Sequence, residues 1–349
     1  MAKLDGLTLR PMTSEPADFD RFARCFAEND APKDLDHLRW QYLDRPGGMP
    51  LADVAVAEVE GEEVFAAIYA AFPSRFVVDG SLTVGCQSLD TMTDHRFRKR
   101  GLFRELATRL YARLADDGYA LVYGFPNSQS VHGFQKYLGW SIDAPAPFLV
   151  RPLRTGLAAR RFLGERAGMF DLPLPAGLGV RRAESVSRSH AFDERFDALW
   201  ERTRLTVRSG LVRDAAYLSW RFDRNPRFDY ETLVVARGDD LLGFVTYRVA
   251  DKHGGRLGYV MELAEAPGTA TAAPLLAEAL RAMRGAGAEM AMAWSLPGTV
   301  THGTLRRLGF FGLPERMRPI ELHFGCAPLA RPRPHPSSWF ISYSDSDTV

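Results

Sequence analysis

The feature that most constrains the fold of this chain is an internal repeat. Residues 37–46 read HLRWQYLDRP and residues 217–226 read YLSWRFDRNP, with leucine, tryptophan, a second aromatic residue and a closing proline in the same places. In both copies the pattern predicts a short helix that ends before the proline, because proline disfavours helical backbone in the residue before it. A repeat of this kind predicts a chain built from two similar units.

The parallel between the two halves continues along the chain. Leucines recur with helical period at 102, 106, 110 and 114, and a similar apolar pattern follows in the second half. Each half therefore predicts strand, two helices, three strands, helix, strand, helix and strand, which is an α/β (α+β) unit with a mixed sheet. The matching segments are 52–57 and 231–236 (strand), 101–117 and 272–284 (helix), 119–125 and 289–296 (strand), and 138–140 and 308–310 (helix end with leucine, glycine and an aromatic residue).

Composition along the chain predicts where the halves begin and end. The segment after the first half is rich in arginine, glycine, leucine and proline, with a short helix expected at 158–165. Near the end, alternating prolines precede an apolar stretch that begins at Trp339, and such a tail is expected to dock on the body. The predicted organisation is a first domain at 1–150, a linker at 151–179, a second domain at 180–328, and a proline-rich arm and tail at 329–349.

The charge balance and the cysteines narrow the functional classes. The 349 residues carry 44 Lys+Arg against 43 Asp+Glu, so no bulk field favours nucleic acid or a membrane surface. No apolar run reaches the roughly 20 residues of a membrane span, and the first residues do not resemble a signal peptide. Cys25, Cys86 and Cys326 lie far apart, which predicts buried thiols, no metal site and a cytoplasmic protein.

The segment with the clearest chemistry is a basic loop at a predicted helix start. Arg98, Lys99, Arg100 and Gly101 follow a predicted strand and precede the first leucine-periodic helix. A helix N-terminus offers unpaired N–H donors and positive potential, and glycine lets a phosphate approach the backbone. The residues alone leave two interpretations open: a pyrophosphate site, or a solvated basic loop that caps an ordinary helix.

This loop resembles the acyl-CoA binding motif of the GNAT superfamily, R-x-x-G-x-G/A at a helix start, with Phe103 in place of the final small residue. Downstream, the resemblance extends to Asn127 after the next strand and to a helix that ends in leucine, glycine and tryptophan. It covers residues 7–150 well and residues 180–325 as fold only, and it implies two tandem GNAT folds. The residues that it implies for CoA are Thr91, Met92, Thr93, Arg98, Lys99, Arg100, Gly101, Leu102, Phe103 and Asn127.

The second half departs from the motif at this loop. Residues 262–269 read ELAEAPGT, which is acidic and contains no arginine. Carboxylates close to a diphosphate repel it by roughly 1 kcal/mol or more per pair even in a screened setting. We therefore expect CoA to bind to the first half, with the second half acting as a scaffold.

The resemblance also implies direct acyl transfer from acetyl-CoA or another acyl-CoA to an amine, with a general base and backbone N–H groups for the oxyanion. Asp90, at the end of the strand before the loop, is the first candidate for the base, with Asp94 and His95 as alternatives. Gln135 stands where the family usually has a tyrosine acid, so His132 is the candidate acid. Both histidines also suit an ordinary surface position.

The acceptor is the least constrained part of the prediction. Asp345 and Asp347 follow the apolar tail and could bind the hydroxyls or ammonium group of a substrate, although a solvated acidic end explains them equally well. The resemblance favours the primary amine of a small molecule, first an amino sugar, with a long-chain amine or an aminoglycoside-like amine as alternatives. A CoA-binding scaffold without turnover is the competing class, and the oligomeric state stays open.

Overall fold

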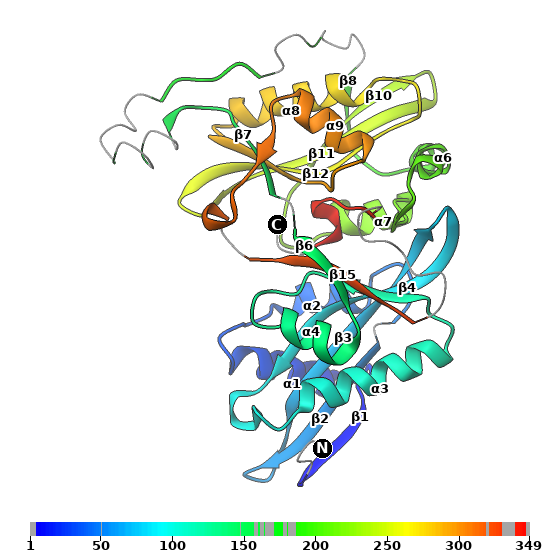
Figure 1. Cartoon of the computed structure of the whole chain (residues 1–349), viewed down its shortest axis with the longest axis vertical. Helices are drawn as coiled ribbons and strands as arrows, with labels where there is room; N and C mark the ends of the chain where they lie inside the picture. Colours follow the sequence, from blue (N-terminus) through cyan, green and yellow to red (C-terminus); the bar gives the residue numbers. More distant parts are fainter. Residues whose placement is uncertain are drawn as a thin grey trace. The chain divides into compact units, whose positions relative to one another are not determined.

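The computed structural model describes residues 5–49, 51–146, 148–156, 160, 164, 171–176, 180, 186–318, 321–329 and 339–346. The chain divides into two compact units (Figure 1). Unit 1 consists of Met1–Ala144, Asn225–Arg227 and Leu322–Pro336, and unit 2 of Pro145–Arg224, Phe228–Glu321 and Ser337–Val349. Each unit contains one mixed sheet with helices on its faces.

The sheet of unit 1 has the order β1-β2-β3-β4-β5-β15-β6. Most neighbours are antiparallel, whereas β4 and β5 run parallel over a short stretch from Cys86 to Ser88. This parallel pair is joined by a helix, as a parallel connection requires. The strands are β1 (Leu7–Pro11), β2 (Leu51–Val59), β3 (Glu62–Val78), β4 (Ser81–Thr93), β5 (Leu121–Gly124), β6 (Ser141–Pro145) and β15 (His323–Pro328).

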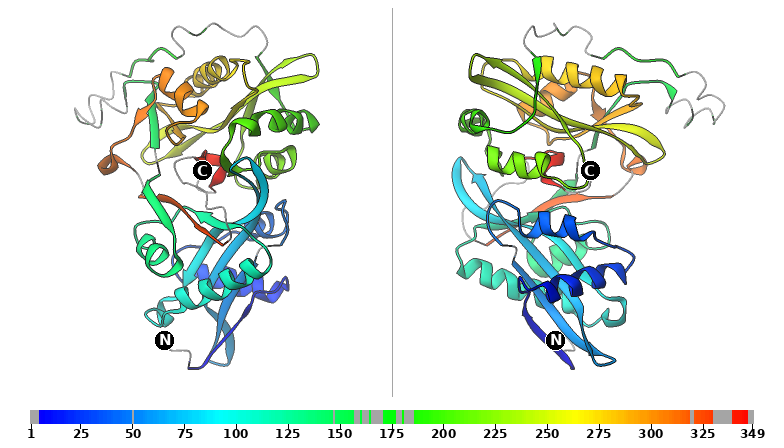
Figure 2. Two further views of the ribbon diagram at one scale, coloured as in Figure 1. Left: turned by 45° about the vertical axis from the view of Figure 1, so that its right-hand side comes forward. Right: turned by 180° about the vertical axis from the view of Figure 1, so that it is seen from behind.

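Helices cover both faces of this sheet, and the alternation of side chains along β2 shows why. Val54 and Val56 point into a cluster with α1 (Pro16–Ala27) and α2 (Leu35–Tyr42), whereas Ala55 and Ala57 point into a second cluster with α3 (Leu102–Asp116). Figure 2 shows α1 and α2 on one face and α3 and α4 (Val131–Leu138) on the other. A short 3-10 helix, η1 (His95–Phe97), links β4 to the loop before α3.

Unit 2 repeats this architecture with the sheet order β14-β7-β13-β12-β11-β10-β8. Its parallel pair is β12 with β13. Its strands are β7 (Phe148–Pro152), β8 (Val186–Ser189), β10 (Glu231–Arg237), β11 (Asp240–Lys252), β12 (Gly255–Glu265), β13 (Met290–Trp294) and β14 (Phe311–Gly312). Its helices are α6 (Glu194–Thr203), η3 (Arg204–Thr206), α7 (Ala215–Leu218), η4 (Ser219–Asp223, a π-helix), α8 (Ala272–Gly285), α9 (Val300–Arg307) and η5 (Glu315–Met317).

The predicted order of elements is confirmed in both halves. The repeated tryptophan segments form α2 in unit 1 and α7 with η4 in unit 2, and each ends before its proline. The leucine-periodic segments form α3 and α8, with Leu106, Leu110 and Leu280 fully buried. The prediction of two tandem α/β units is therefore confirmed. The expected helix at 158–165 lies largely outside the described residues.

The two halves of the sequence exchange a strand. β7 follows the first half along the chain but lies between β13 and β14 of unit 2, whereas β15 follows the second half but lies between β5 and β6 of unit 1. The two strands take equivalent places in their sheets. Hence the compact units differ from the predicted boundaries at these exchanged segments.

The described end of the chain belongs to unit 2 and is buried. β16 (Trp339–Phe340) pairs in parallel with β9 (Ser209–Leu211), and η7 (Tyr343–Asp345) follows. Trp339 is 1% exposed, and every residue from 339 to 346 is buried. The described residues 339–346 are thus packed within unit 2 and do not form a solvated end.

Two further sequence predictions concern the cysteines and membrane spans. All three cysteines are buried and free, and burial raises the pKa of Cys25 and Cys86 to about 12, so neither thiol is poised as a nucleophile. Within the described part of the chain, no helix is both long and apolar enough to cross a bilayer.

Candidate active site

A cavity of about 840 Å³ opens in unit 1 where β4 and β5 separate. The two strands pair up to Ser88 and Gly124, after which β4 continues to Thr93 while β5 ends. Among the described residues, the main chain of β4 beyond Ser88 therefore has no strand partner on the β5 side. The walls of the cavity come from residues 88–93 of β4, residues 98–103 before and at the start of α3, and residues 125–130 after β5, together with Asn29, Phe134 and Trp140.

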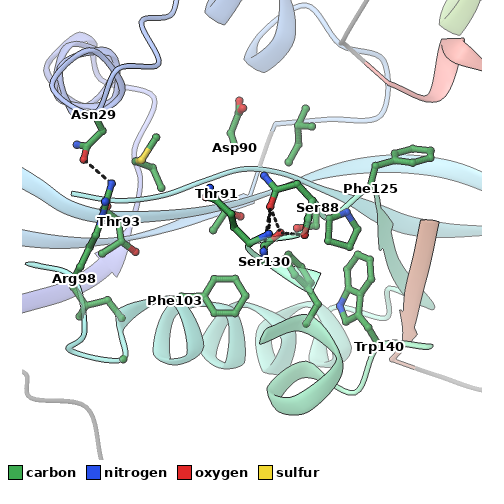
Figure 3. A pocket seen from close by; sticks show the side chains of 18 of the residues that line it. Asn29, Ser88, Asp90, Thr91, Thr93, Arg98, Phe103, Phe125, Ser130 and Trp140 are labelled. Carbon is green, nitrogen blue, oxygen red and sulfur yellow. Dashed lines mark hydrogen bonds between the residues drawn. The ribbon is translucent and has the colours of Figure 1, made fainter. Parts of the chain in front are cut away.

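Asp90 lies at an irregularity in β4. Its φ of +55° is left-handed, and the register between β3 and β4 shifts at this point, so β4 carries a bulge there. The Asp90 carboxylate accepts hydrogen bonds from Lys33 Nζ and from the hydroxyl of Tyr42, the latter at 3.2 Å. Figure 3 shows Asp90 on the side of β4 that faces away from Phe103. The predicted base is thus part of the cavity wall and is held by an ammonium group.

The basic loop opens α3 with an uncapped N-terminus. Lys99 and Gly101 both have positive φ, at +64° and +79°, and Gly101 is the N-cap residue with no side-chain cap. The first N–H groups of α3 therefore have no partner from a capping side chain, which is the arrangement that binds phosphate. The Arg98 guanidinium donates hydrogen bonds to Thr93 O at 3.3 Å and to Asn29 Oδ1 at 3.4 Å, so its side chain points from the loop toward the end of β4 (Figure 3).

The opposite wall begins with Asn127. Its Oδ1 accepts hydrogen bonds from the N–H groups of Gln129 and Ser130, both at 3.1 Å, and so it organises the turn that starts α4. Phe103 from α3 packs against Phe134 of α4 with ring centroids 5.3 Å apart. A Cβ on Gly133 would lie 3.1 Å from the Phe103 ring, so glycine at this position lets the two helices approach.

Three other residues considered from the sequence lie away from the cavity lining. Asp94 is fully buried and accepts hydrogen bonds from the Arg96 side chain at 2.7 and 3.0 Å. Burial alone would raise the pKa of Asp94, but the bonds from Arg96 lower it below its ordinary value. The His95 and His132 side chains are exposed, on η1 and α4, and neither lines the cavity. Gln135 is exposed as well.

The acidic tail residue Asp345 lies in the core of unit 2. Its carboxylate pairs with Arg213 at 2.6 Å, and Arg213 also pairs with Glu262 at 3.0 Å. Burial raises the pKa of Asp345 to about 6, assisted by the nearby Glu262 and opposed by Arg213. The carboxylate is 1% exposed, so we leave it out of the candidate site. Asp347 lies outside the described residues.

Several residues of the site escaped sequence reasoning. Lys33 before α2 and Tyr42 at the end of α2 hold Asp90, while Ser88 and Trp140 line the cavity. One signal for Lys33 exists in the repeat. Lys33 precedes α2 by two residues, as Arg213 precedes α7, so both halves carry a cation at this place.

In the loop of unit 2 that corresponds to the CoA motif, an acidic side chain binds the start of the following helix. The carboxylate of Glu265 accepts a hydrogen bond at 2.8 Å from the N–H of Ala272, the first residue of α8. A cavity of about 460 Å³ lies beside it, between the ends of β12 and the start of α9. A helix N-terminus that already binds a carboxylate has less to offer a second anion.

In the described parts of both units, no group of three or more His, Cys, Asp or Glu side chains is arranged to hold a metal ion.

The comparisons with known proteins agree with this geometry. Residues 10–142 match the family described as the acetyltransferase (GNAT) domain, which spans the β4 bulge, the basic loop and α4. No curated protein sequence matches the chain.

Solved structures extend the likeness to nearly the whole chain. A protein of unknown function from Enterococcus faecalis, described as a probable N-acyltransferase, is 11% identical with a TM-score of 0.65, over 93% of this chain and 73% of that chain. Saccharomyces cerevisiae N-myristoyltransferase with bound myristoyl-CoA is 12% identical with a TM-score of 0.60, over 96% and 85% of the two chains. A GCN5-related N-acetyltransferase from Anabaena variabilis is 10% identical with a TM-score of 0.64, over 92% and 73%.

At such low identity these structures establish the shared fold, whereas the domain match concerns residues 10–142. The second half of the chain repeats the sheet order of the first. The chain therefore carries a GNAT acetyltransferase domain at residues 10–142, followed by a second copy of the same fold.

Proposed function

We propose that unit 1 binds one acyl-CoA in the cavity between β4 and β5 and transfers its acyl group to the primary amine of a small molecule. The observation that carries this proposal is the start of α3 at Gly101, which has no side-chain cap, beside the part of β4 that extends beyond its pairing with β5. In the proposal, the pyrophosphate occupies the first N–H groups of α3 near Arg98, Lys99 and Arg100.

The pantetheine arm would follow residues 89–93 of β4. Its two amides can pair with main-chain groups of a strand that has no neighbour on this side, as an added strand would. Thr91, Met92 and Thr93 line the cavity and so would border the arm, with Leu102 and Phe103 beneath it and Asn127 on the opposite wall.

Asp90 is the proposed general base. Asp90 lines the cavity, and the bonds of its carboxylate to Lys33 and Tyr42 fix its position. The amine nitrogen attacks the thioester carbonyl carbon and gives its proton to Asp90, the carbon–sulfur bond breaks, and the proton finally reaches the sulfur of CoA. A main-chain N–H at the β4 bulge would stabilise the oxyanion. Asp94 is less suited to this role because Arg96 occupies its buried carboxylate.

For the acceptor we propose a small polar amine, first an amino sugar. Polar side chains of Asn29, Gln129 and Ser130 line the same cavity as Asp90 and can meet the hydroxyls of such a molecule. A long-chain amine and an aminoglycoside-like amine are the alternatives. We also propose a cytoplasmic enzyme, with which three buried free thiols are compatible.

The test is release of free CoA thiol from acetyl-CoA, measured with glucosamine, a long-chain alkylamine and an aminoglycoside in parallel. The proposal predicts thiol release that depends on an amine and is largest with glucosamine. Release with one of the other amines would keep the transferase and replace the acceptor class. CoA binding without thiol release, for every amine and every acyl chain length, would favour a CoA-binding scaffold. The exposed Gln135 at the usual position of the acid is compatible with that class.

A further inference from the structure

Behind the cavity of unit 1 lies a chain of four hydrogen-bonding side chains. Trp140 Nε1 donates to the hydroxyl of Tyr111 at 2.9 Å, the Tyr111 and Tyr69 hydroxyls are 2.8 Å apart, and the Tyr69 hydroxyl is 2.9 Å from Ser88 Oγ. Ser88 and Trp140 line the cavity, whereas Tyr69 is fully buried and Tyr111 is 9% exposed. Residues from β3, β4, α3 and the segment after α4 thus meet in one linear network.

The direction of this network follows from its chemistry. An indole N–H can donate and cannot accept, so Tyr111 must accept from Trp140. If Tyr69 donated to Tyr111, the buried proton of Tyr111 would have no acceptor among the described residues, which is costly. Tyr111 therefore donates to Tyr69, and Tyr69 donates to Ser88. The Ser88 hydroxyl is left with its own proton to donate.

That proton is available to the cavity. Among the described residues the Ser88 side chain has no hydrogen-bond partner other than Tyr69, and Ser88 is the last residue of β4 that pairs with β5. The pantetheine arm has the reach of about four extended residues. Because Thr93 lies five residues from Ser88, an arm that starts at the α3 loop ends near this point.

We propose that Ser88 donates a hydrogen bond to the sulfur of CoA and stabilises it as the carbon–sulfur bond breaks, with Tyr69 and Tyr111 as positioning residues that align the Ser88 hydroxyl. This inference rests on the proposed function and adds the group that donates a hydrogen bond to the leaving sulfur. Ser88 keeps its proton. The electron pair of the broken bond stays on sulfur, and the sulfur takes the proton that Asp90 removed from the amine.

Two observations support this role. Burial raises the pKa of Tyr69 and of Tyr111, so both hydroxyls hold their protons across any assay range. Aligned hydrogen bonds also polarise one another, which makes the last donor stronger than an isolated serine. The network therefore offers a fixed donor in a protein whose usual acid position holds the exposed Gln135.

The experiment uses CoA itself and needs no acceptor. A donor aimed at sulfur stabilises the thiolate, so the pKa of the bound CoA thiol, followed by thiolate absorbance in the ultraviolet, reports the hydrogen bond. Ser88→Ala is expected to raise this pKa by about one to two units relative to the wild-type complex. Ser88→Thr, which keeps a hydroxyl, should restore most of the shift.

Tyr69→Phe is expected to raise the thiol pKa by about half as much in the wild-type background and to have no effect in a Ser88→Ala background. Tyr259→Phe removes a buried tyrosine hydroxyl in unit 2 and serves as the matched control, with no expected change. An unchanged thiol pKa in Ser88→Ala, or an equal effect of Tyr69→Phe in both backgrounds, would overturn the inference. Absence of CoA binding to the wild-type protein would instead refute the proposed function.

Discussion

Both units place a cation before the repeated helix and a carboxylate on a strand with a register shift, which is β4 in unit 1 and β12 in unit 2. In unit 1 these are Lys33 and Asp90, whose side chains are 15% and 7% exposed, and Asp90 lines a large cavity. In unit 2 they are Arg213 and Glu262, which are 3% and 0% exposed. The same ion pair is thus accessible in one unit and closed off in the other.

The chain's own tail closes the pair in unit 2. Ser342 and Ser344 each donate a hydrogen bond to Glu262, at 2.8 and 2.6 Å, and Asp345 pairs with Arg213. The Arg213 guanidinium lies over the Phe340 ring, with its Cζ 4.9 Å from the ring centroid. Since a buried ion pair needs its remaining hydrogen bonds satisfied, this segment completes a structural network.

The helix that follows this strand, α3 after β4 and α8 after β12, is also open in unit 1 and occupied in unit 2. α3 begins at Gly101 with no capping side chain, whereas the first N–H of α8 already binds the Glu265 carboxylate. The comparison teaches that the fold supplies an anion site and a strand-end carboxylate in both copies. In unit 2 the chain's own side chains occupy both the anion site and the strand carboxylate, so only unit 1 keeps them available for a ligand.

The largest expected effect separates the two carboxylates. Asp90→Asn should lower kcat by about 10²- to 10⁴-fold, because it keeps the shape and loses the base. The matched change Glu262→Gln should leave kcat of the folded protein unchanged and lower its thermal midpoint. Turnover at the wild-type rate in Asp90→Asn would mean that the Lys33–Asp90 pair is structural, like the Arg213–Glu262 pair of unit 2.

A smaller effect is expected from the two loop glycines, which share a φ of +79°. Gly101→Asp should weaken CoA binding about a hundredfold or more, because a carboxylate at the N-cap of α3 would occupy the anion site as Glu265 does in unit 2. Gly268→Asp carries the same backbone strain beside α8 and serves as the control. Equal CoA affinity in the two variants, measured by calorimetry, would remove the distinction between the loops.

Truncation after residue 341 tests how much the tail stabilises unit 2 by covering the Arg213–Glu262 pair. Removing residues 342–349 takes away the partners of Arg213 and Glu262, so unit 2 should lose about 3–5 kcal/mol of unfolding free energy. Denaturant unfolding measures the loss. CoA affinity of the truncated protein is the internal control and should stay unchanged while the protein is folded. A truncated chain of full stability would mean that these contacts contribute nothing net.

The smallest effect is a pH dependence confined to unit 2. The folded pKa of Asp345, about 6, lies above the ordinary value of 3.8, so its protonated form favours the folded state. The contribution is present below about pH 4 and is lost as the pH rises through 6. Asp345→Asn should therefore reduce the fall in thermal midpoint between pH 4 and 6. An unchanged slope in the variant would place the titration elsewhere.

Sequence reasoning could predict the features that depend on neighbours along the chain. The helical period of Leu102, Leu106 and Leu110, the position of Gly101 at a helix start and the acidic second loop all follow from local pattern. Local pattern does not state which sheet an apolar strand joins. For this reason the exchange of β7 and β15 between the two sheets could not be predicted from the sequence.

Long-range pairing was equally out of reach. Asp345 meets Arg213 across 132 positions, and Ser88, Tyr69, Tyr111 and Trp140 come together from four separate segments. In each case the partners are polar residues with no spacing that marks them. The tail acids looked like a surface for substrate, and burial of Asp345 in an ion pair explains why an acidic end can instead be part of a core.

The central claim is that only the first of two similar units binds CoA, and the stoichiometry of CoA binding to the full chain tests it most directly. Calorimetric titration should give one site in the wild-type protein and in Gly268→Asp, and no measurable site in Gly101→Asp. Two sites in the wild-type protein, or one remaining in Gly101→Asp but lost in Gly268→Asp, would contradict the claim.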